Sequence, residues 1–255
     1  MTDETVPRLR PVTPVGLAVE ALEQGEPDRA LALLRDLDAY LSASSSPASP
    51  ALSELARRSD LHPWDPDRPL EAEMLSGHVE GRLLSLLVKL SGATRILDIG
   101  TFTGYSALSM AEAVEPGGEV VTCELDQGVA DMAAAAFAGS PVADRIRLEV
   151  GPALETLRRL ADAGERFDLA FLDADKPGYL PVYRALLDLG LVGPGGLIVA
   201  DNTLLQGQPY AGGVEVDANG AAIAEFNAAL TADDRVEQVL LPVRDGVTLA
   251  RVSAP

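Results

Sequence analysis

The sequence predicts an α/β protein built on a mostly parallel sheet with helices on both faces. Three observations support this fold class. Apolar strand-like runs alternate with helical stretches over most of the chain, a glycine-containing loop joins the first run to a helix, and the last two runs flank a turn. The 255 residues are sufficient for one such domain with an N-terminal extension.

The N-terminal part, residues 1–70, is expected to be a helical extension. Thr13 is placed to cap a helix, and helical spacing then continues with an interruption near Gly25 to Pro27. This pattern predicts two helices or one kinked helix. The string SASSSPASP and the prolines around Trp64 then break the chain. The expected domains are therefore an extension that acts as a lid or in dimerisation, and a main domain over residues 71–255.

The elements of the main domain are expected in a regular order. A helix over GHVEGRLLSLLVKLSG ends at Gly92. Five apolar runs then predict strands: RILDIG, EVVTCEL, RIRLEV, FDLAFLDA and GLIVAD. The helical stretches between them are YSALSMAEAV, GVADMAAAAFAG, ALETLRRLADAG and YLPVYRALLDLG. The final segment predicts two strands around a turn at Asp245 and Gly246, which would complete a sheet of seven strands with an antiparallel end.

Composition limits the class of partner. A formal charge of −19 would repel nucleic acid and anionic membrane surfaces, so neither is an expected partner. The single cysteine, Cys123, lies in an apolar run and can form no internal disulfide, which fits a reducing cytoplasm. Residues 1–14 contain no apolar core of a secretion signal, and no stretch reaches the roughly 18 apolar residues of a membrane span.

The string ILDIGTFTGYSAL has the form of a cofactor-binding loop. Asp98 ends the first strand, and Gly100 and Gly104 lie in the turn before a helix, where backbone can approach a ligand. The spacing is GxxxG rather than the GxGxxG of a dinucleotide site, which weakens a nicotinamide interpretation. Glu124 ends the second strand, where a carboxylate can accept hydrogen bonds from ribose hydroxyls. An inert turn with a solvated carboxylate is the alternative.

Two polar strings, FLDADK and ADNT, follow neighbouring apolar runs. Asp173, Asp201 and Asn202 are therefore expected to converge at the carboxyl edge of the sheet, where their oxygens would suit a divalent cation. Lys176 follows Asp173 by three residues and would lie close to the same point. A cluster that merely caps a helix and balances charge is the alternative.

These strings, together with MLSGHVEGRLLSLLVKL, EVGPALETL and LPVRDGVTLAR, resemble the class I S-adenosylmethionine-dependent, cation-dependent O-methyltransferases of the caffeoyl-CoA and catechol type. The resemblance covers about residues 70 to 253. It implies a Rossmann-like fold whose last strand is antiparallel, and a homodimer. It also implies that the following residues surround S-adenosylmethionine: Ser76, Asp98, Gly100, Thr101, Ser106, Glu124, Ala153 and Asp175.

The resemblance places the catalytic general base at Lys176, beside Asp173. Methyl transfer to a phenol requires alignment of the two reactants and removal of the phenolic proton. A cation such as Mg²⁺ would retain positions for two adjacent substrate oxygens, which favours a catechol. Departures from plant members at Gln206 and Val182 leave the acceptor open, and the loop around Gln206 and the segment around Trp64 are candidates to line its pocket.

The expected function is therefore a divalent-cation-dependent O-methyltransferase acting on a catechol-like small aromatic or natural product. An NAD(P)-dependent oxidoreductase on the same frame is one alternative, but it leaves FLDADK and ADNT without a role. A non-catalytic cofactor-binding scaffold is the other. Binding of S-adenosylhomocysteine but not NAD(P), with chelator-sensitive methylation, would distinguish the three.

Overall fold

The computed structural model describes residues 13–67 and 70–254, which form two compact units, Met1–Pro47 and Ala48–Pro255. Residues 1–12, which belong to the expected extension, lie outside the described part of the chain. They include most of the segment 1–14, in which the sequence predicts no secretion signal. The expected extension covers residues 1–70, but the chain divides after Pro47, so residues 48–70 belong to the larger unit. The reason is packing: Leu52 and Leu55 are buried in the core of that unit.

The described part of the smaller unit contains three helices: α1 (Pro14–Glu23), α2 (Pro27–Arg35) and α3 (Leu37–Ala43). The predicted cap is confirmed, because the Thr13 side chain accepts a hydrogen bond from Gly16 N at 3.0 Å. The helical pattern is interrupted at Gly25, as expected. Among the described residues, the hydrophobic side chains buried between these helices are small: Ala18, Ala21 and Ala30.

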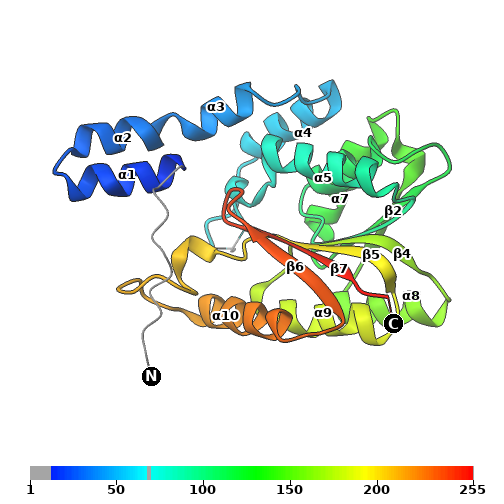
Figure 1. Ribbon diagram of the computed structural model, residues 1–255. Helices are drawn as coiled ribbons and strands as arrows, with labels where there is room; N and C mark the ends of the chain where they lie inside the picture. Colours follow the sequence, from blue (N-terminus) through cyan, green and yellow to red (C-terminus); the bar gives the residue numbers. More distant parts are fainter. Residues whose placement is uncertain (1–12, 68–69, 255) are drawn as a thin grey trace. The chain divides into compact units, whose positions relative to one another are not determined.

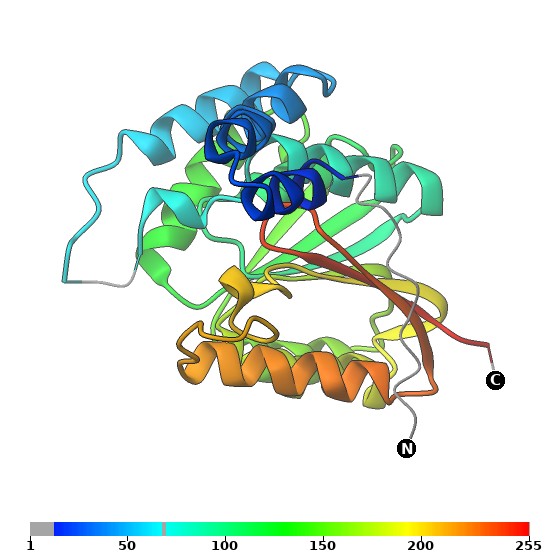
Figure 2. The ribbon, with the colours of Figure 1, turned by 60° about the vertical axis from the view of Figure 1, so that its left-hand side comes forward.

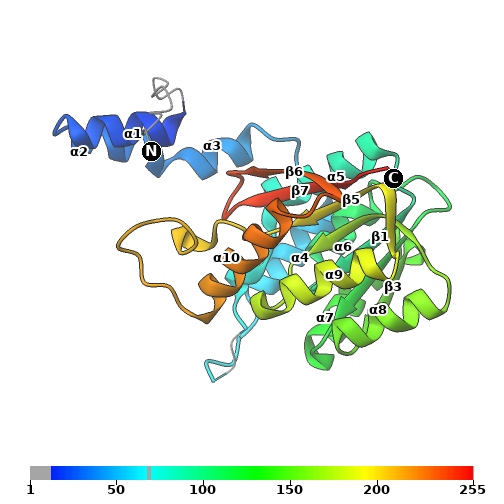
Figure 3. The same ribbon diagram turned by 60° about the horizontal axis from the view of Figure 1, so that its bottom comes forward.

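The larger unit confirms the predicted sheet. Its seven strands are β1 (Arg95–Ile99), β2 (Glu119–Glu124), β3 (Ile146–Val150), β4 (Phe167–Leu172), β5 (Val192–Ala200), β6 (Val236–Leu241) and β7 (Val247–Val252). They lie in the order β3-β2-β1-β4-β5-β7-β6. The first five are parallel, and β7 runs antiparallel between β5 and β6, as Figure 3 shows. The chain order reverses direction between β1 and β4, which is where α/β sheets bind ligands.

Helices cover both faces of this sheet. They are α4 (Pro50–Asp60), α5 (Gly77–Ser91), α6 (Tyr105–Ala111), α7 (Gln127–Ala138), α8 (Ala153–Asp162), α9 (Tyr179–Asp188) and α10 (Ala218–Thr231). The predicted end of α5 is confirmed, because Gly92 caps it in the left-handed conformation with φ of 68°. Helices α8, α9 and α10 lie on one face, and α4, α5 and α7 lie on the other (Figures 1 and 2).

Successive side chains along a strand point into hydrophobic clusters on opposite faces of the sheet. In β4, Leu169 and Phe171 point into the cluster under α4 to α7, whereas Ala170 and Leu172 point into the cluster under α8 to α10. Burial on both faces explains why the predicted strands read as continuous apolar runs. Within residues 13–67 and 70–254, no helix is both long and apolar enough to cross a membrane.

Candidate active site

The predicted site lies at the carboxyl edge of three neighbouring strands, β1, β4 and β5. Backbone hydrogen bonds extend the sheet just beyond the strand ends: Asp173 N donates to Ile99 O at 2.9 Å, and Asp201 N donates to Leu172 O at 3.1 Å. These bonds fix the backbone that carries both acidic residues. The strands thus bring together side chains that are far apart in the chain.

Lys176 is at the centre of the predicted catalytic group. Its Nζ donates to Asp173 Oδ1 at 3.1 Å, to Asn202 Oδ1 at 2.5 Å and to Tyr179 Oη at 2.8 Å. Asn202 itself has a φ of 54°, a left-handed backbone that is uncommon outside glycine. We call the five residues Asp173, Lys176, Tyr179, Asp201 and Asn202 the lysine cluster.

Tyr179 belongs to this cluster although sequence reasoning did not single it out. It is fully buried at the start of α9, and its hydroxyl donates to Asp201 O at 3.0 Å. Burial raises its pKa well above 10, and the neighbouring carboxylates add to the rise. Its position three residues after Lys176 was the available signal, because a turn of helix places residues at that spacing side by side.

Asp201 is a buried member of the cluster, and within the described ranges one of its two carboxylate oxygens has no hydrogen-bond donor or counter-charge in contact with it. Its Oδ2 accepts a hydrogen bond from Asn202 Nδ2 at 3.0 Å, but its buried Oδ1 has no hydrogen-bond partner among the described residues. Burial raises the pKa of Asp201 to about 7, and the charge of Asp173 contributes. An ionised Asp201 therefore requires a hydrogen-bond donor or a positive charge at this oxygen.

The donor set of the cluster suits a hard divalent cation. It offers carboxylate oxygens from Asp173 and Asp201 and the amide oxygen of Asn202, which are oxygen ligands of the kind Mg²⁺ uses. No group of three His, Cys, Asp or Glu side chains in the described ranges is arranged to hold a metal ion. Lys176 Nζ donates hydrogen bonds to two of the expected metal ligands, Asp173 and Asn202. The unpartnered Oδ1 of Asp201 is the observation that fits a cation.

Glu80 is a second buried carboxylate beside the lysine cluster, and it was also missed. It lies on α5 with a side-chain exposure of 1%, and Arg244 Nη1 is 3.6 Å from its Oε2. Burial raises the pKa of Glu80 to about 10, and Asp201 and Asp173 raise it further against the opposing effect of Arg244. Sequence reasoning could not pair residues so distant in the chain.

Three of the residues predicted for the cofactor, Asp98, Thr101 and Ser106, form a connected group around the end of β1. Asp98 is fully buried, and its Oδ2 accepts hydrogen bonds from Thr122 Oγ1 at 2.6 Å and Ser106 Oγ at 3.2 Å. Burial raises the pKa of Asp98 to about 7 despite these bonds. Thr101 joins the group, because its hydroxyl is 2.6 Å from that of Thr122.

Glu124 is oriented by the glycine loop. Its Oε2 accepts from Phe102 N at 2.8 Å, and its Oε1 accepts from Asp126 N at 2.9 Å. Burial raises its pKa from 4.5. The other predicted cofactor residues lie at the start of helices or turns: Ser76 before α5, Ala153 at the first position of α8 and Asp175 before the turn Lys176–Gly178. In the described part of the chain, none of these three has a side-chain hydrogen bond to the Asp98 group.

The residues considered for the acceptor pocket separate into two places. Trp64 stacks on Phe102 of the glycine loop, with ring centroids 5.0 Å apart, so it lies beside the loop predicted to bind the cofactor. The backbone N of Gln206 donates to Asp245 Oδ1 at 2.7 Å, which ties the loop after β5 to the β6–β7 turn. Val182 is buried in the core under α8 to α10 and has no surface to offer a substrate.

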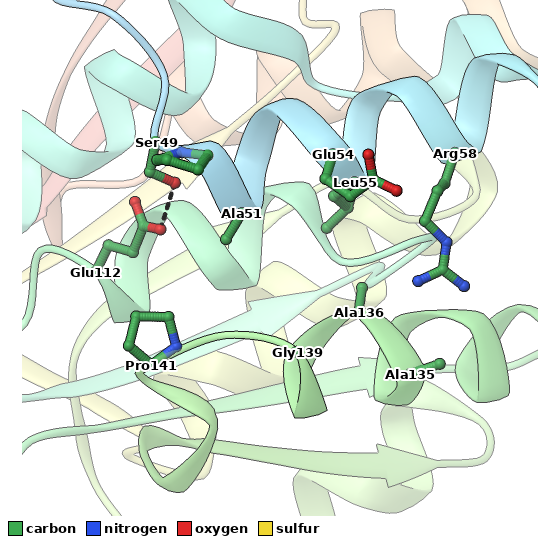
Figure 4. A pocket seen from close by; sticks show the side chains of 11 residues that line it. Ser49, Ala51, Glu54, Leu55, Arg58, Glu112, Ala135, Ala136, Gly139 and Pro141 are labelled. Carbon is green, nitrogen blue, oxygen red and sulfur yellow. Dashed lines mark hydrogen bonds between the residues drawn. The ribbon is translucent and has the colours of Figure 1, made fainter.

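A surface cavity of about 390 Å³ lies away from the lysine cluster, between α4 and the end of α7 (Figure 4). Ser49 Oγ donates to Glu112 Oε1 at 2.5 Å within it. None of the predicted site residues lines this cavity. The cavity lies where α4 packs beside α7, and the hydrogen bond between Ser49 and Glu112 joins the start of α4 to the end of α6.

Comparison with known proteins identifies the family. Residues 42–253 match the family model described as O-methyltransferase. The caffeoyl-CoA O-methyltransferase 2 of Zea mays is 37% identical over 234 residues, which cover 86% of this chain and 84% of the maize protein. The crystal structure of the SAH-bound methyltransferase PaMTH1 from Podospora anserina has a TM-score of 0.76 at 32% identity and covers 86% of this chain and 95% of that chain.

A further solved structure supports the same assignment. The O-methyltransferase TomG from Streptomyces achromogenes, in complex with SAM, has a TM-score of 0.71 at 34% identity, covering 86% of this chain and 96% of TomG. The shared family model extends from α3 to the last strand. The chain therefore belongs to the class I S-adenosylmethionine-dependent O-methyltransferase family.

Proposed function

We propose that this O-methyltransferase requires a divalent cation, with Mg²⁺ as the first choice, and methylates one hydroxyl of a catechol-like small aromatic or natural product. The observation that carries the proposal is the lysine cluster. A lysine amine lies within hydrogen-bond distance of Asp173 and Asn202, beside the unpartnered Oδ1 of Asp201. The family assignment replaces the oxidoreductase and scaffold alternatives.

Asp173, Asp201 and Asn202 would hold the cation in this proposal. When bound, a cation of this kind supplies Lewis acidity that lowers the pKa of an acceptor hydroxyl, and its open positions suit two adjacent oxygens. The paired hydroxyls of a catechol meet that requirement. The net charge of −19 favours a free acceptor over the polyanionic CoA thioester for which the maize relative is named.

Lys176 is assigned the role of general base. The acceptor oxygen attacks the methyl carbon of S-adenosylmethionine, the carbon–sulfur bond breaks, and the hydroxyl proton passes to Lys176 Nζ. To accept this proton Nζ must be an amine with a lone pair, so it can keep only two of its three donated hydrogen bonds during the reaction. The products are the methyl ether and S-adenosylhomocysteine. Asp173 and Tyr179 hold Nζ in place through the hydrogen bonds at 3.1 and 2.8 Å, so little rearrangement of this side chain is needed.

The cofactor is assigned to the edge of β1 and β2. Glu124 is proposed to accept hydrogen bonds from the ribose hydroxyls, because the backbone N–H groups of Phe102 and Asp126 already orient both of its oxygens. Asp98 and Asp175 are proposed to lie near the methionine end. The remaining proposed contacts come from Ser76, Gly100, Thr101, Ser106 and Ala153.

The test is a methylation assay with a panel of catechols and monophenols, read by mass spectrometry with and without chelator. Catechols should be methylated, chelator should abolish turnover, and added Mg²⁺ should restore it. Lys176→Met should abolish turnover but leave the affinity for S-adenosylhomocysteine nearly unchanged in calorimetry. Lys89→Met, which changes an exposed lysine on α5, is the matched control. Full activity in chelator would reject the cation, and turnover by Lys176→Met would reject the base.

The assembly is proposed to be a cytoplasmic homodimer, with the smaller unit serving as a lid or a dimerisation element. This unit exposes large apolar side chains that its own three helices do not cover: Val15, Val19, Leu22, Leu31, Leu34, Tyr40 and Leu41. Light scattering and assay of the intact chain and of a variant that begins at Ala48 test the role. A dimeric, fully active truncated protein would count against both functions.

A further inference from the structure

Glu80 is buried in an environment that disfavours an ionised carboxylate. It lies on α5 one turn beyond Ser76 and is fully buried. Neither of its oxygens accepts a hydrogen bond from a described donor group, and the side chain within hydrogen-bonding reach is another carboxyl, that of Asp201. Burying a carboxylate without hydrogen bonds or a close counter-charge costs several kcal/mol. A hydrophobic side chain of similar size would fill the same space without this cost, so the carboxylate itself needs an explanation.

Arg244 is held so that it faces Glu80 from the turn between β6 and β7. Its Nη1 donates to Leu75 O at 3.1 Å and lies 3.6 Å from Glu80 Oε2. Gly77 makes room for the guanidinium, because a Cβ at that residue would come within 2.9 Å of Nη1. Arg244 also has a φ of 48°, which a residue with a side chain rarely adopts. The backbone and a glycine are thus both arranged around this one cation.

Arg244 does not compensate all of the negative charge in this region. Asp201 and Asp173 both act on Glu80 electrostatically, and Asp201 Oδ1 is unpartnered as well. Lys176 is directed to Asp173 and Asn202, and Arg244 is 39% exposed in its side chain. Glu80 and Asp201 therefore face each other as two buried carboxyls within hydrogen-bonding reach, and no other described donor reaches Glu80 Oε1, Glu80 Oε2 or Asp201 Oδ1. A further positive charge between Glu80 and Asp201 would relieve this.

We propose that Glu80 is a positioning residue of the reaction centre: held by Arg244, its carboxylate stabilises the divalent cation bound at Asp173, Asp201 and Asn202. This inference rests on the proposed cation dependence. No three His, Cys, Asp or Glu side chains among the described residues are arranged to hold a metal ion, so Glu80 does not complete a direct ligand set with Asp173 and Asp201. Glu80 would therefore act on the cation through its charge rather than as a further direct ligand.

Glu80→Gln in the full chain tests this, with Glu155→Gln on the exposed surface of α8 as the matched control. In chelator, Glu80→Gln should melt at a higher temperature than the wild type, because an uncompensated buried acid has been removed. Its affinity for Mn²⁺, measured by calorimetry and electron paramagnetic resonance, should fall by about 10- to 100-fold. The rise in melting temperature on adding Mn²⁺ should shrink accordingly, and Glu155→Gln should match the wild type in all three.

The outcomes separate this inference from the proposed function. If the wild type itself binds no Mn²⁺, the cation dependence fails. If the wild type binds Mn²⁺ and Glu80→Gln binds it equally well, only the role of Glu80 fails. A lower melting temperature of Glu80→Gln in chelator would show that Glu80 serves the fold, and it would overturn the inference as well.

Discussion

Gly100 and Asp173 lie in direct backbone contact across the carboxyl edge of β1 and β4. A Cβ added to Gly100 would come within 1.8 Å of the Asp173 carbonyl oxygen. Gly100 also has a φ of 106°, a conformation that side chains disfavour. The glycine loop and the strand end that carries Asp173 are therefore positioned by one contact, which couples the cofactor side of the site to the lysine cluster.

Gly100→Ala is expected to destabilise the protein by about 2–4 kcal/mol, because it adds a steric clash to backbone strain. The affinity for S-adenosylhomocysteine should also fall, because the glycine loop must move to relieve the clash with the Asp173 carbonyl oxygen. Urea unfolding and calorimetry measure the two effects. Gly164→Ala is the control: its φ is 78°, but a Cβ there meets nothing within 4 Å, so only the strain of about 1 kcal/mol remains. Equal losses in both variants would contradict a role for the contact.

Tyr179→Phe is expected to lower kcat about tenfold, because the net contribution of one hydrogen bond to Lys176 is about 1.4 kcal/mol. The KM for S-adenosylmethionine should change little. Tyr183→Phe is the matched control on the same helix, because its hydroxyl bonds Asp233 at 2.9 Å and not the lysine cluster. Steady-state kinetics of both variants would decide the matter, and equal kcat values would show that Tyr179 does not orient the lysine.

Trp64 is expected to report cofactor binding, because it is the single tryptophan of the chain and stacks on Phe102 in the glycine loop. Its fluorescence should change and saturate on titration with S-adenosylhomocysteine. Trp64→Ala should weaken binding roughly 2- to 12-fold, in line with about 0.5–1.5 kcal/mol for an aromatic pair. Trp64→Phe should retain the affinity by calorimetry. Unaltered binding by Trp64→Ala would separate this residue from the cofactor site.

Asp233 is expected to contribute pH-dependent stability outside the active site. Hydrogen bonds from Arg235 are the main cause that lowers the pKa of Asp233 to about 2, against an ordinary value of 3.8. The folded state therefore binds fewer protons than the unfolded state between these values. This stability is fully present above about pH 4 and is lost as the pH falls toward 2.

Asp233→Asn should thus lose about 0.5–1 kcal/mol of unfolding free energy at pH 7, a modest amount because Arg235 is partly exposed and solvent screens the pair. The difference from the wild type should shrink between pH 4 and pH 2 in urea titrations. Asp162→Asn, at an exposed site on α8, should show no such convergence. A constant difference at every pH would mean that the lost interaction is not ionic.

Much of the fold could be read from the order of residues along the chain. The run FDLAFLDA indicated a strand buried on both faces, and Leu169 and Ala170 indeed enter opposite cores. Gly92 marked the end of α5 because the left-handed cap conformation favours glycine. The lysine cluster was predictable because carboxyl ends of parallel strands meet at one edge, so Asp173 and Asn202 had to approach each other.

The sequence by itself thus determined the sheet, the site's position and the family's motifs, because these depend on local periodicity and on strand ends. Only the tertiary structure decided which distant side chains meet. It paired Arg244 with Glu80 and placed Trp64 against Phe102 of the glycine loop. Such contacts depend on how a turn or a linker packs against a helix, and no local pattern encodes that packing. The charge balance around Asp201 therefore became visible only when the folded chain brought these groups together.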